Sequence, residues 1–247
     1  MSAGEPSTET GTAGVLTRDV GLVAISLDRP IDAREVDELV HRGIGAVEVR
    51  LDLFEPLDVA AIDATLSALS AVPVITTVRS AAEGGRWTDD DASRARLYRA
   101  VLDRTTWIDL ELADAAAYRA VIADAQRTGV GVILSFHDFE TTPSTMALDE
   151  LATRAATFGA DVVKVATRTD TAEDLAALVA FTIARRSIDV IAVGMGTFGP
   201  MSRVMLPLMG SKVTFAATDR CSVPGQLGLD DTVELMTRLA TANSPQT

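Results

Sequence analysis

The sequence predicts a (β/α)8 barrel, also called a TIM barrel, in which one domain alternates eight parallel strands with eight helices. Eight short aliphatic or β-branched runs recur along the chain, and their starts lie about 24–35 residues apart. Amphipathic segments separate these runs. Because that spacing is the length of one strand-helix unit, and eight units are the number that closes a barrel, the pattern favours this fold.

The predicted strands are short and largely apolar, as buried parallel strands are. In chain order they are Val20–Leu27, Ala46–Phe54, Val72–Arg79, Trp107–Leu112, Gly131–Phe139, Asp161–Thr167, Asp189–Gly196 and Val213–Thr218. An open, doubly wound sheet is the alternative, because it has the same alternation. No Gly-x-Gly-x-x-Gly motif follows the first strand, which weakens the dinucleotide-binding form of that alternative.

Helical signals follow the fourth, fifth and sixth strands. Apolar residues recur three or four positions apart at 118–125 and 175–183. Thr171 and Asp174 have capping-box spacing, which predicts that a helix begins there. Pro143 stands where a first helical turn would begin after the fifth strand.

Composition and charge limit the class of protein. The 247 residues are 47% hydrophobic and only 4% aromatic, which indicates a globular domain with an aliphatic core. We expect this domain to span residues 19–243, between polar tails at 1–18 and 244–247. A formal net charge of −13 argues against nucleic-acid binding.

Neither a membrane nor an oxidising compartment is indicated. The chain contains no apolar run of the length that a membrane span needs, and its N-terminal residues do not resemble a signal peptide. The single cysteine, Cys221, cannot form an internal disulfide. We therefore expect a soluble, cytoplasmic protein.

Charged and polar side chains interrupt the predicted strands near their carboxyl ends, where a barrel points them into its active site. Any one of them alone is most often a structural salt bridge or a solvated strand end. Together they indicate a polar pocket, because burying unpaired charges is costly. The set is Glu48, Arg50, Arg79, Asp109, Glu111, His137 and Lys164.

Lys164 is one of only two lysines in the chain and stands within an apolar run. Apolar neighbours and nearby arginines should favour the neutral amine, which attacks ketones. His137 on the adjacent strand is a suitable base for the proton that the resulting iminium loosens. The alternative for Lys164 is a side chain that reaches the solvent at the barrel rim. The other histidine, His41, is expected on the surface.

Two kinds of ligand fit the charged positions. Arg50, Arg79 and Arg203 offer fixed charge and paired donors for a carboxylate. The glycines of 194–199 could instead accept a phosphate. A Mg²⁺ site would use carboxylates, but the interleaved arginines disfavour a cation, so we expect no metal. Those carboxylates are Glu48, Asp52, Asp109 and Glu111.

Six motifs occur in one order along almost the whole chain. They are Glu48-x-Arg50, the segment Arg79–Gly85, Ser135–Phe139 with Thr142-Pro143, Asp161–Ala166, Met195-Gly196 with Gly199 and Ser202-Arg203, and the segment Ser222–Gln226. In this order they resemble type I 3-dehydroquinate dehydratases of the shikimate pathway, which leads to chorismate and the aromatic amino acids. Each motif alone is weak, whereas their succession is specific.

The resemblance implies a role for each matching residue. Lys164 would form the Schiff base, His137 would move protons, and Glu83 would orient His137. Asp109 would help to hold His137. The residues implied in binding the substrate are Glu48, Arg50, Arg79, Arg203, Ser222 and Gln226.

The implied reaction is the syn elimination of water from 3-dehydroquinate to give 3-dehydroshikimate, without a metal or an organic cofactor. The resemblance also implies a homodimer. Two departures concern the rim of the pocket: Gly194 stands where a serine is common, and Thr167–Thr169 replaces a more apolar continuation. These affect expectations of fine specificity more than of reaction type.

Two other functions stay open at this point. A class I aldolase or transaldolase shares the lysine chemistry but breaks a carbon–carbon bond, and the Ser-x-Pro-Gly-Gln segment argues against it. A catalytically silent carboxylate-binding or regulatory protein could use the same fold. Retention of both Lys164 and His137 argues against that reading.

Overall fold

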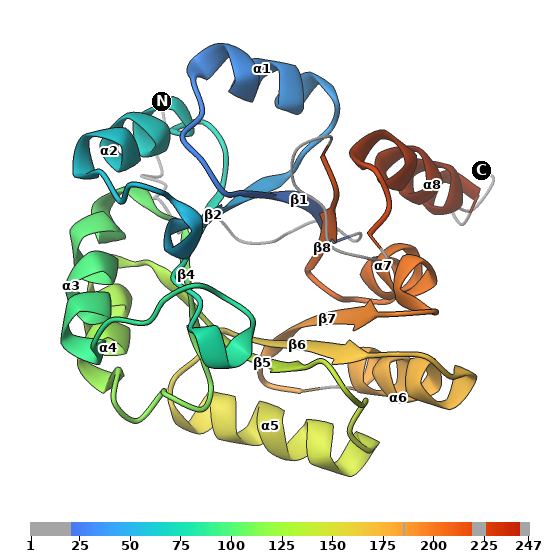
Figure 1. The fold of residues 1–247 in the computed structure, drawn as a ribbon. Helices are drawn as coiled ribbons and strands as arrows, with labels where there is room; N and C mark the ends of the chain where they lie inside the picture. Colours follow the sequence, from blue (N-terminus) through green and yellow to red (C-terminus); the bar gives the residue numbers. More distant parts are fainter. Residues whose placement is uncertain (1–20, 185, 219–225, 243–247) are drawn as a thin grey trace, which may run out of the picture.

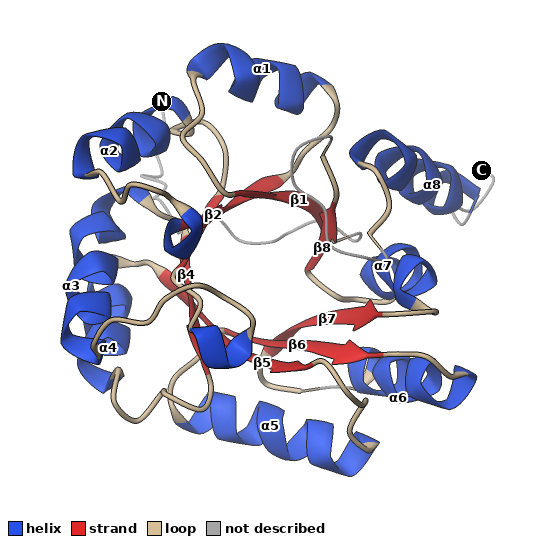
Figure 2. Cartoon of the chain, in the orientation of Figure 1, coloured by secondary structure: helices blue, strands red, loops and turns tan. Residues whose placement is uncertain are grey.

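A computed structural model describes residues 21–184, 186–218 and 226–242. Eight parallel strands form a ring, and the helices lie outside it (Figure 1, Figure 2). The predicted (β/α)8 barrel is confirmed. The tails expected at 1–18 and 244–247 lie outside the described residues, so the domain limits stay a prediction.

The strands keep the predicted order; seven of them are shorter than predicted, and the sixth has the predicted length but is shifted by one residue. They are β1 (Leu22–Leu27), β2 (Ala46–Arg50), β3 (Val74–Thr77), β4 (Trp107–Glu111), β5 (Gly131–Asp138), β6 (Val162–Arg168), β7 (Asp189–Met195) and β8 (Val213–Ala216). Their order in the sheet is β7-β6-β5-β4-β3-β2-β1-β8. The ring is nearly closed between β7 and β8 by contacts just before β8: the Lys212 amide donates to Val190 O at 2.9 Å, and the Ala192 amide donates to Ser211 Oγ at 3.0 Å.

A helix follows each strand. The helices are α1 (Ala33–His41), α2 (Val59–Ala68), α3 (Asp91–Val101), α4 (Arg119–Thr128), α5 (Thr145–Thr157), α6 (Ala172–Ile183), α7 (Gly199–Leu208) and α8 (Leu229–Ala242). Short 3-10 turns occupy η1 (Leu51–Leu53), η2 (Ala81–Glu83) and η3 (Leu102–Arg104). Among the described residues, no helix combines the length and apolarity needed to cross a bilayer.

Two apolar layers support the barrel, because alternate strand residues point to opposite faces. The larger layer packs the outward strand faces against the helices. The smaller layer fills the barrel interior with side chains such as Ile75, Trp107, Ile133 and Ile191. Since this interior is packed, the polar side chains further along the same strands gather at the carboxyl ends.

Local signals succeeded in one place and failed in two others. The capping box is confirmed: Thr171 Oγ1 accepts from the Asp174 amide at 3.1 Å. The second strand was predicted too long, because it ends at Arg50, where the chain turns into η1. The helix start predicted at Pro143, after Thr142, was also wrong, since Ser144 caps α5 and the helix begins at Thr145.

Candidate active site

Side chains from adjacent strands meet at the carboxyl end of the barrel. Lys164 on β6 is in register with Ser135 on β5, and His137 lies two residues further along the same strand. Residues separated by two positions share a face, so these three strand positions face the barrel interior. Glu48 on β2 and Asp109 on β4 complete the ring around the lysine.

The Lys164 amine is buried between two carboxylates. Its Nζ lies 2.9 Å from Asp109 Oδ2 and 3.4 Å from Glu48 Oε1. The ring centroid of Phe215 lies 4.5 Å away. The predicted apolar neighbour is present in Phe215, but the charged groups in direct contact with the amine are carboxylates and not the expected arginines. The nearest charges are negative, because β2 and β4 both turn a carboxylate toward β6.

Glu48 has a full set of partners. Its Oε2 accepts from Ser26 Oγ at 2.5 Å, and its Oε1 accepts from Thr77 Oγ1 at 2.9 Å. Burial raises the pKa of this carboxyl group, but the positive charges of Lys164 and Arg50 outweigh burial and hold it below its ordinary value. Glu48 is therefore a carboxylate at neutral pH.

Arg79 and Asp109 form a second buried pair. Arg79 donates to Asp109 Oδ1 at 2.6 Å, to Glu111 Oε1 at 3.1 Å and to Ser135 Oγ at 2.7 Å. Although burial opposes ionisation, Arg79 and Lys164 hold the pKa of Asp109 well below its usual range. The oxygens of Asp109 accept from Arg79, Ser135 and Lys164, and its charge also acts on the nearby His137, so its part in holding His137 stays a prediction.

His137 instead contacts Glu83. Its Nδ1 lies 2.8 Å from Glu83 Oε2, and the ring stacks on Phe139 at a centroid distance of 6.4 Å. Burial, together with the positive charges of Arg79 and Lys164, lowers the pKa of His137 well below its ordinary value. The imidazole is therefore neutral at neutral pH.

Burial also raises the pKa of Glu83, to about 7. Once ionised, its carboxylate accepts the Nδ1 proton of His137 and leaves Nε2 as the basic nitrogen. The contact thus selects the tautomer that a proton-abstracting histidine needs.

The other two candidate arginines differ in their partners. Arg50 donates to both oxygens of Asp52, at 2.9 and 2.8 Å. Arg203 on α7 is 4% exposed and donates to Phe215 O at 3.0 Å, while its Nε has no hydrogen-bond partner in the described part of the chain. Burial lowers its pKa to about 10. A buried cation with a spare donor is suited to an incoming carboxylate.

The last two candidates belong to the segment after β8. Ser222 lies outside the described residues. Gln226 is described and half-buried; it directly precedes Leu227, whose carbonyl accepts from the Ala217 amide at 2.8 Å just beyond β8. That hydrogen bond brings Gln226 back to the carboxyl end of the barrel.

Four partners at the site were missed from the sequence: Ser26, Thr77, Ser135 and Phe215. A usable signal existed for Ser135, because it stands two positions before His137 and shares its face. Hydroxyls in strands are common, so nothing in the sequence singled out Ser26 or Thr77.

The Mg²⁺ alternative is not supported. Within the described ranges, no group of three or more His, Cys, Asp or Glu side chains could hold a metal ion. Lys164 or an arginine contacts each of the four carboxylates proposed for it, so cationic side chains already occupy the positions of a metal. Those carboxylates are Glu48, Asp52, Asp109 and Glu111.

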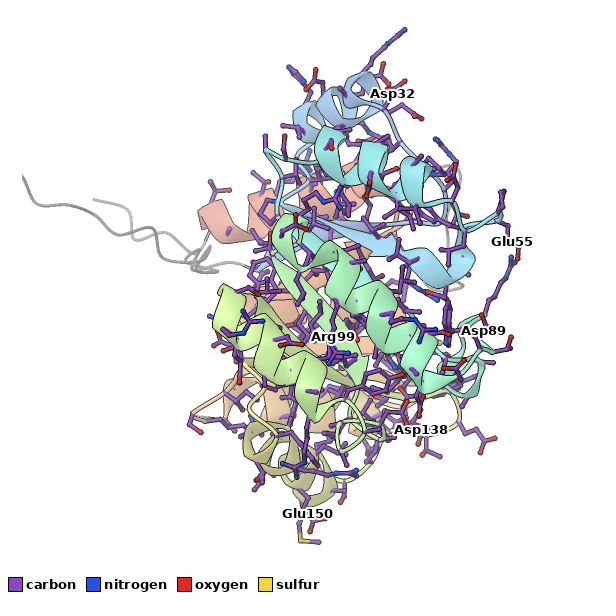
Figure 3. The ribbon with its side chains drawn as sticks, turned by 90° about the vertical axis from the view of Figure 1, so that its left-hand side faces the viewer. Asp32, Glu55, Asp89, Arg99, Asp138 and Glu150 are labelled. Atoms are coloured by element: carbon purple, nitrogen blue, oxygen red, sulfur yellow. The ribbon has the colours of Figure 1, made fainter. Side chains whose placement is uncertain are left out.

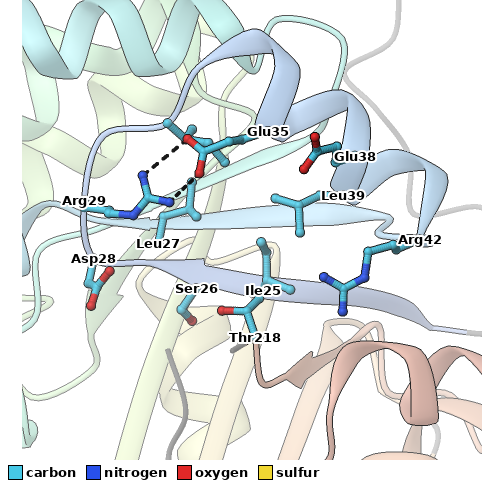
Figure 4. A pocket seen from close by; sticks show the side chains of 11 residues that line it. Ile25, Ser26, Leu27, Asp28, Arg29, Glu35, Glu38, Leu39, Arg42 and Thr218 are labelled. Carbon is cyan, nitrogen blue, oxygen red and sulfur yellow. Dashed lines mark hydrogen bonds and ion pairs between the residues drawn. The ribbon is translucent and has the colours of Figure 1, made fainter. Parts of the chain in front are cut away.

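A cavity of about 220 Å³ lies beside this site, between β1 and α1. Figure 4 shows Ser26 and Thr218 along one side and the Arg29–Glu35 ion pair along the other. Ser26 is the link to the site, since it also donates to Glu48. The charged candidates themselves do not line this cavity.

Comparisons with known proteins agree with the arrangement. The family model described as type I 3-dehydroquinase matches residues 23–242. A 3-dehydroquinate dehydratase of Methanosarcina acetivorans is 32% identical over 235 residues, covering 91% of this chain and 96% of the relative. The enzyme of that name from Thermodesulfovibrio yellowstonii is 30% identical, covering 90% and 96%. The crystal structure of 3-dehydroquinate dehydratase from Geobacillus kaustophilus has a TM-score of 0.83 and 27% identity, covering 90% of this chain and 92% of that one.

Proposed function

The chain belongs to the type I 3-dehydroquinase family of hydro-lyases, and from this premise we propose that it dehydrates 3-dehydroquinate through an imine on Lys164. The observation that carries the proposal is the buried Lys164 amine, one strand away from a neutral histidine. An amine and a base on neighbouring strands are the two groups that this elimination requires.

The first steps belong to Lys164. Its neutral amine attacks the ketone carbon of the substrate, and the carbonyl oxygen leaves as water, so that an iminium remains. This iminium withdraws electrons from the adjacent carbon. A proton on that carbon then becomes removable by a moderate base.

We assign that base to His137. Glu83 holds its Nδ1 at 2.8 Å, which supports Nε2 as the atom that takes the proton. The same nitrogen returns a proton to the departing hydroxyl, which leaves as water. Hydrolysis of the imine consumes one water and releases 3-dehydroshikimate and the free amine. The net change is the loss of one water.

Substrate binding falls to the remaining polar groups. The spare donor of Arg203 supports this residue as the partner of the substrate carboxylate. Glu48, Arg50, Ser222 and Gln226 are proposed partners of the hydroxyls. Arg79 already donates to Asp109, Glu111 and Ser135. These contacts support an indirect part for Arg79 in substrate binding, chiefly by holding Asp109 in position.

Location and assembly are proposals of the same kind. The single cysteine supports a cytoplasmic enzyme, and the family resemblance supports a homodimer. Sedimentation of the purified chain measures the second of these directly.

One assay tests the function as a whole. Purified protein is mixed with 3-dehydroquinate, and the ultraviolet absorbance of the conjugated enone is followed. A steady rise that depends on enzyme concentration supports the proposal, whereas carbon–carbon cleavage products would favour the aldolase alternative. Binding of substrate with no product at all would favour a silent binding protein.

A further inference from the structure

Six buried charged side chains of alternating sign form a continuous row from helix α3 to Lys164 and beyond. We call these residues the charge row: Arg94, Glu111, Arg79, Asp109, Lys164 and Glu48. Each residue is at most 5% exposed. Every neighbouring pair in the row is in direct contact, at 3.1 Å for Glu111–Arg79, 2.6 Å for Arg79–Asp109, 2.9 Å for Asp109–Lys164 and 3.4 Å for Lys164–Glu48, and Arg94 donates to Glu111.

Arg94 begins the row but takes no part in the chemistry proposed above. Its Nε donates to Val78 O at 2.8 Å, another nitrogen donates to Asp114 at 3.1 Å, and its guanidinium lies 5.3 Å from the centroid of the Tyr118 ring. These contacts fix the guanidinium in one place. Fixed there, it faces Glu111 with a full positive charge.

Glu111 is therefore shared between two arginines. One oxygen accepts from Arg79 and from the Ser80 amide, and the other accepts from Arg94. Without Arg94, the charge of Glu111 would be balanced by Arg79 alone. Arg79 would then balance less of the charge on Asp109, and Asp109 would hold the ammonium form of Lys164 more strongly.

We propose that Arg94 is a positioning residue, which acts through Glu111, Arg79 and Asp109 to make the Lys164 amine available for imine formation. This inference rests on the proposed function only in naming imine formation as the step that benefits. The effect on the amine itself is a property of the free protein.

Other charges also face the amine and must stay constant in a test. The charged groups come from β2 (Glu48 and Arg50), from Arg79 after β3 and from β4 (Asp109), while β5 contributes the neutral His137 and β8 the Phe215 ring. Variants of Arg94 and Glu111 leave all of these in place. They change only the far end of the charge row.

The two lysines of the chain allow a direct measurement without substrate. A trace of deuterated acetic anhydride acetylates only neutral amines, and peptide mass mapping gives the labelling rate of Lys164 against Lys212 in the same sample. Lys212 lies 3.4 Å from Asp189 and serves as the internal reference. The rate is measured as a function of pH.

Three variants of the charge row and one control define the outcome. Arg94→Met should move the Lys164 labelling curve to higher pH by about 0.5–1 pH unit. This is the size expected for the loss of one positive charge at an effective dielectric of about 20. Glu111→Gln should move the curve to lower pH. The double variant should lie near the wild type, because the two charge changes cancel, whereas structural damage would accumulate.

The control is Arg99→Met on the same helix. Arg99 is 40% exposed and is labelled in Figure 3. It pairs with Asp124 at 2.7 Å. Its Lys164 curve should match the wild type. Equal curves for Arg94→Met and Arg99→Met would overturn the inference, and if Arg94→Met does not fold, an unchanged curve for Glu111→Gln overturns it instead.

Borohydride trapping with 3-dehydroquinate separates the two proposals. If the wild type forms no adduct at Lys164, the imine mechanism is refuted. The acetylation curves would still test the role of Arg94, because they are measured without substrate. If trapping occurs, Arg94→Met should slow it about 3–10-fold near neutral pH, in proportion to its shift.

Discussion

The Nδ1 atom of His137 on β5 lies 2.8 Å from Oε2 of Glu83, in the turn that follows β3. Burial disfavours charge on both groups, so the pKa of His137 is lowered and the pKa of Glu83 is raised to about 7. The protonation state of the acid therefore changes near neutral pH. Below that point, the neutral acid can donate to Nδ1 and make Nε2 the protonated nitrogen, which is the wrong tautomer for a base.

This relationship predicts a pH dependence. As pH rises through about 7, Glu83 loses its proton, and kcat of the wild type should rise. Glu83→Gln should lose this rise near pH 7 and lower kcat about 10–100-fold, because a hydrogen bond to a charged group is worth roughly 1.5–3 kcal/mol. A pH–rate profile of both proteins measures the effect. A variant that keeps the wild-type profile would assign the rise to another group.

The imine predicts a specific covalent product. Borohydride added during turnover should inactivate the protein and attach the reduced substrate to Lys164, because reduction turns an imine into a stable amine. Lys164→Ala should lose activity almost completely. Peptide mass mapping locates the adduct, and an adduct on Lys212, or none, would contradict the mechanism.

Much of this site could be predicted, because the patterns that indicate Lys164 and His137 each lie within a single strand. The rare Lys164 in an apolar run and the alternation of side chains placed the lysine and His137 on adjacent strands, with His137 near its strand end. The partnership of Glu83 with His137 came from the family resemblance. A distance of 54 residues separates them, and no periodicity connects them.

What the sequence could not supply is which charges become neighbours across the barrel. Lys164 contacts Glu48, which lies 116 residues away, and Asp109, which lies 55 residues away. These contacts depend on strand register and on the curvature of the sheet, which the sequence pattern does not give. Arginines were therefore expected beside Lys164, where carboxylates stand. The start of α5 failed for a local reason: Ser144 and Thr142 are both good caps, and Thr142 instead donates to Arg168 O at 2.6 Å.

Arg203 predicts opposite effects on binding and stability. Arg203→Met removes the proposed partner of the substrate carboxylate, so KM should rise about 10–100-fold with a smaller change in kcat. It also removes a buried cation whose Nε has no partner in the described ranges, so the melting temperature should stay the same or increase. Steady-state kinetics and thermal unfolding measure the two effects.

Arg127→Met provides the matched control for Arg203. Arg127 is largely exposed and pairs with Asp124 on the surface of α4, and it is not one of the proposed substrate-binding residues. Its KM should equal that of the wild type. If Arg203→Met binds substrate normally, another group must receive the carboxylate, and Arg50 would be the next to test.

The last prediction separates the proton-moving role of His137 from the covalent role of Lys164. His137→Ala leaves the amine and its contacts with Asp109 and Glu48 in place, so the variant should still bind substrate and form the imine. Turnover should fall by roughly the 10²–10⁴-fold contribution of a positioned acid–base group, or by more if several steps need it. Imine formation also needs proton transfers, so trapping should slow as well.

Incubation of His137→Ala with 3-dehydroquinate and borohydride should therefore give slow labelling at Lys164 with little enone released. Mass spectrometry follows the label, and ultraviolet absorbance follows the product in the same sample. Because the two readouts report different steps, loss of product with retained labelling places His137 after imine formation. Near-normal turnover would instead make His137 an ordinary strand-end histidine and would move the base role to Glu83 or Glu48.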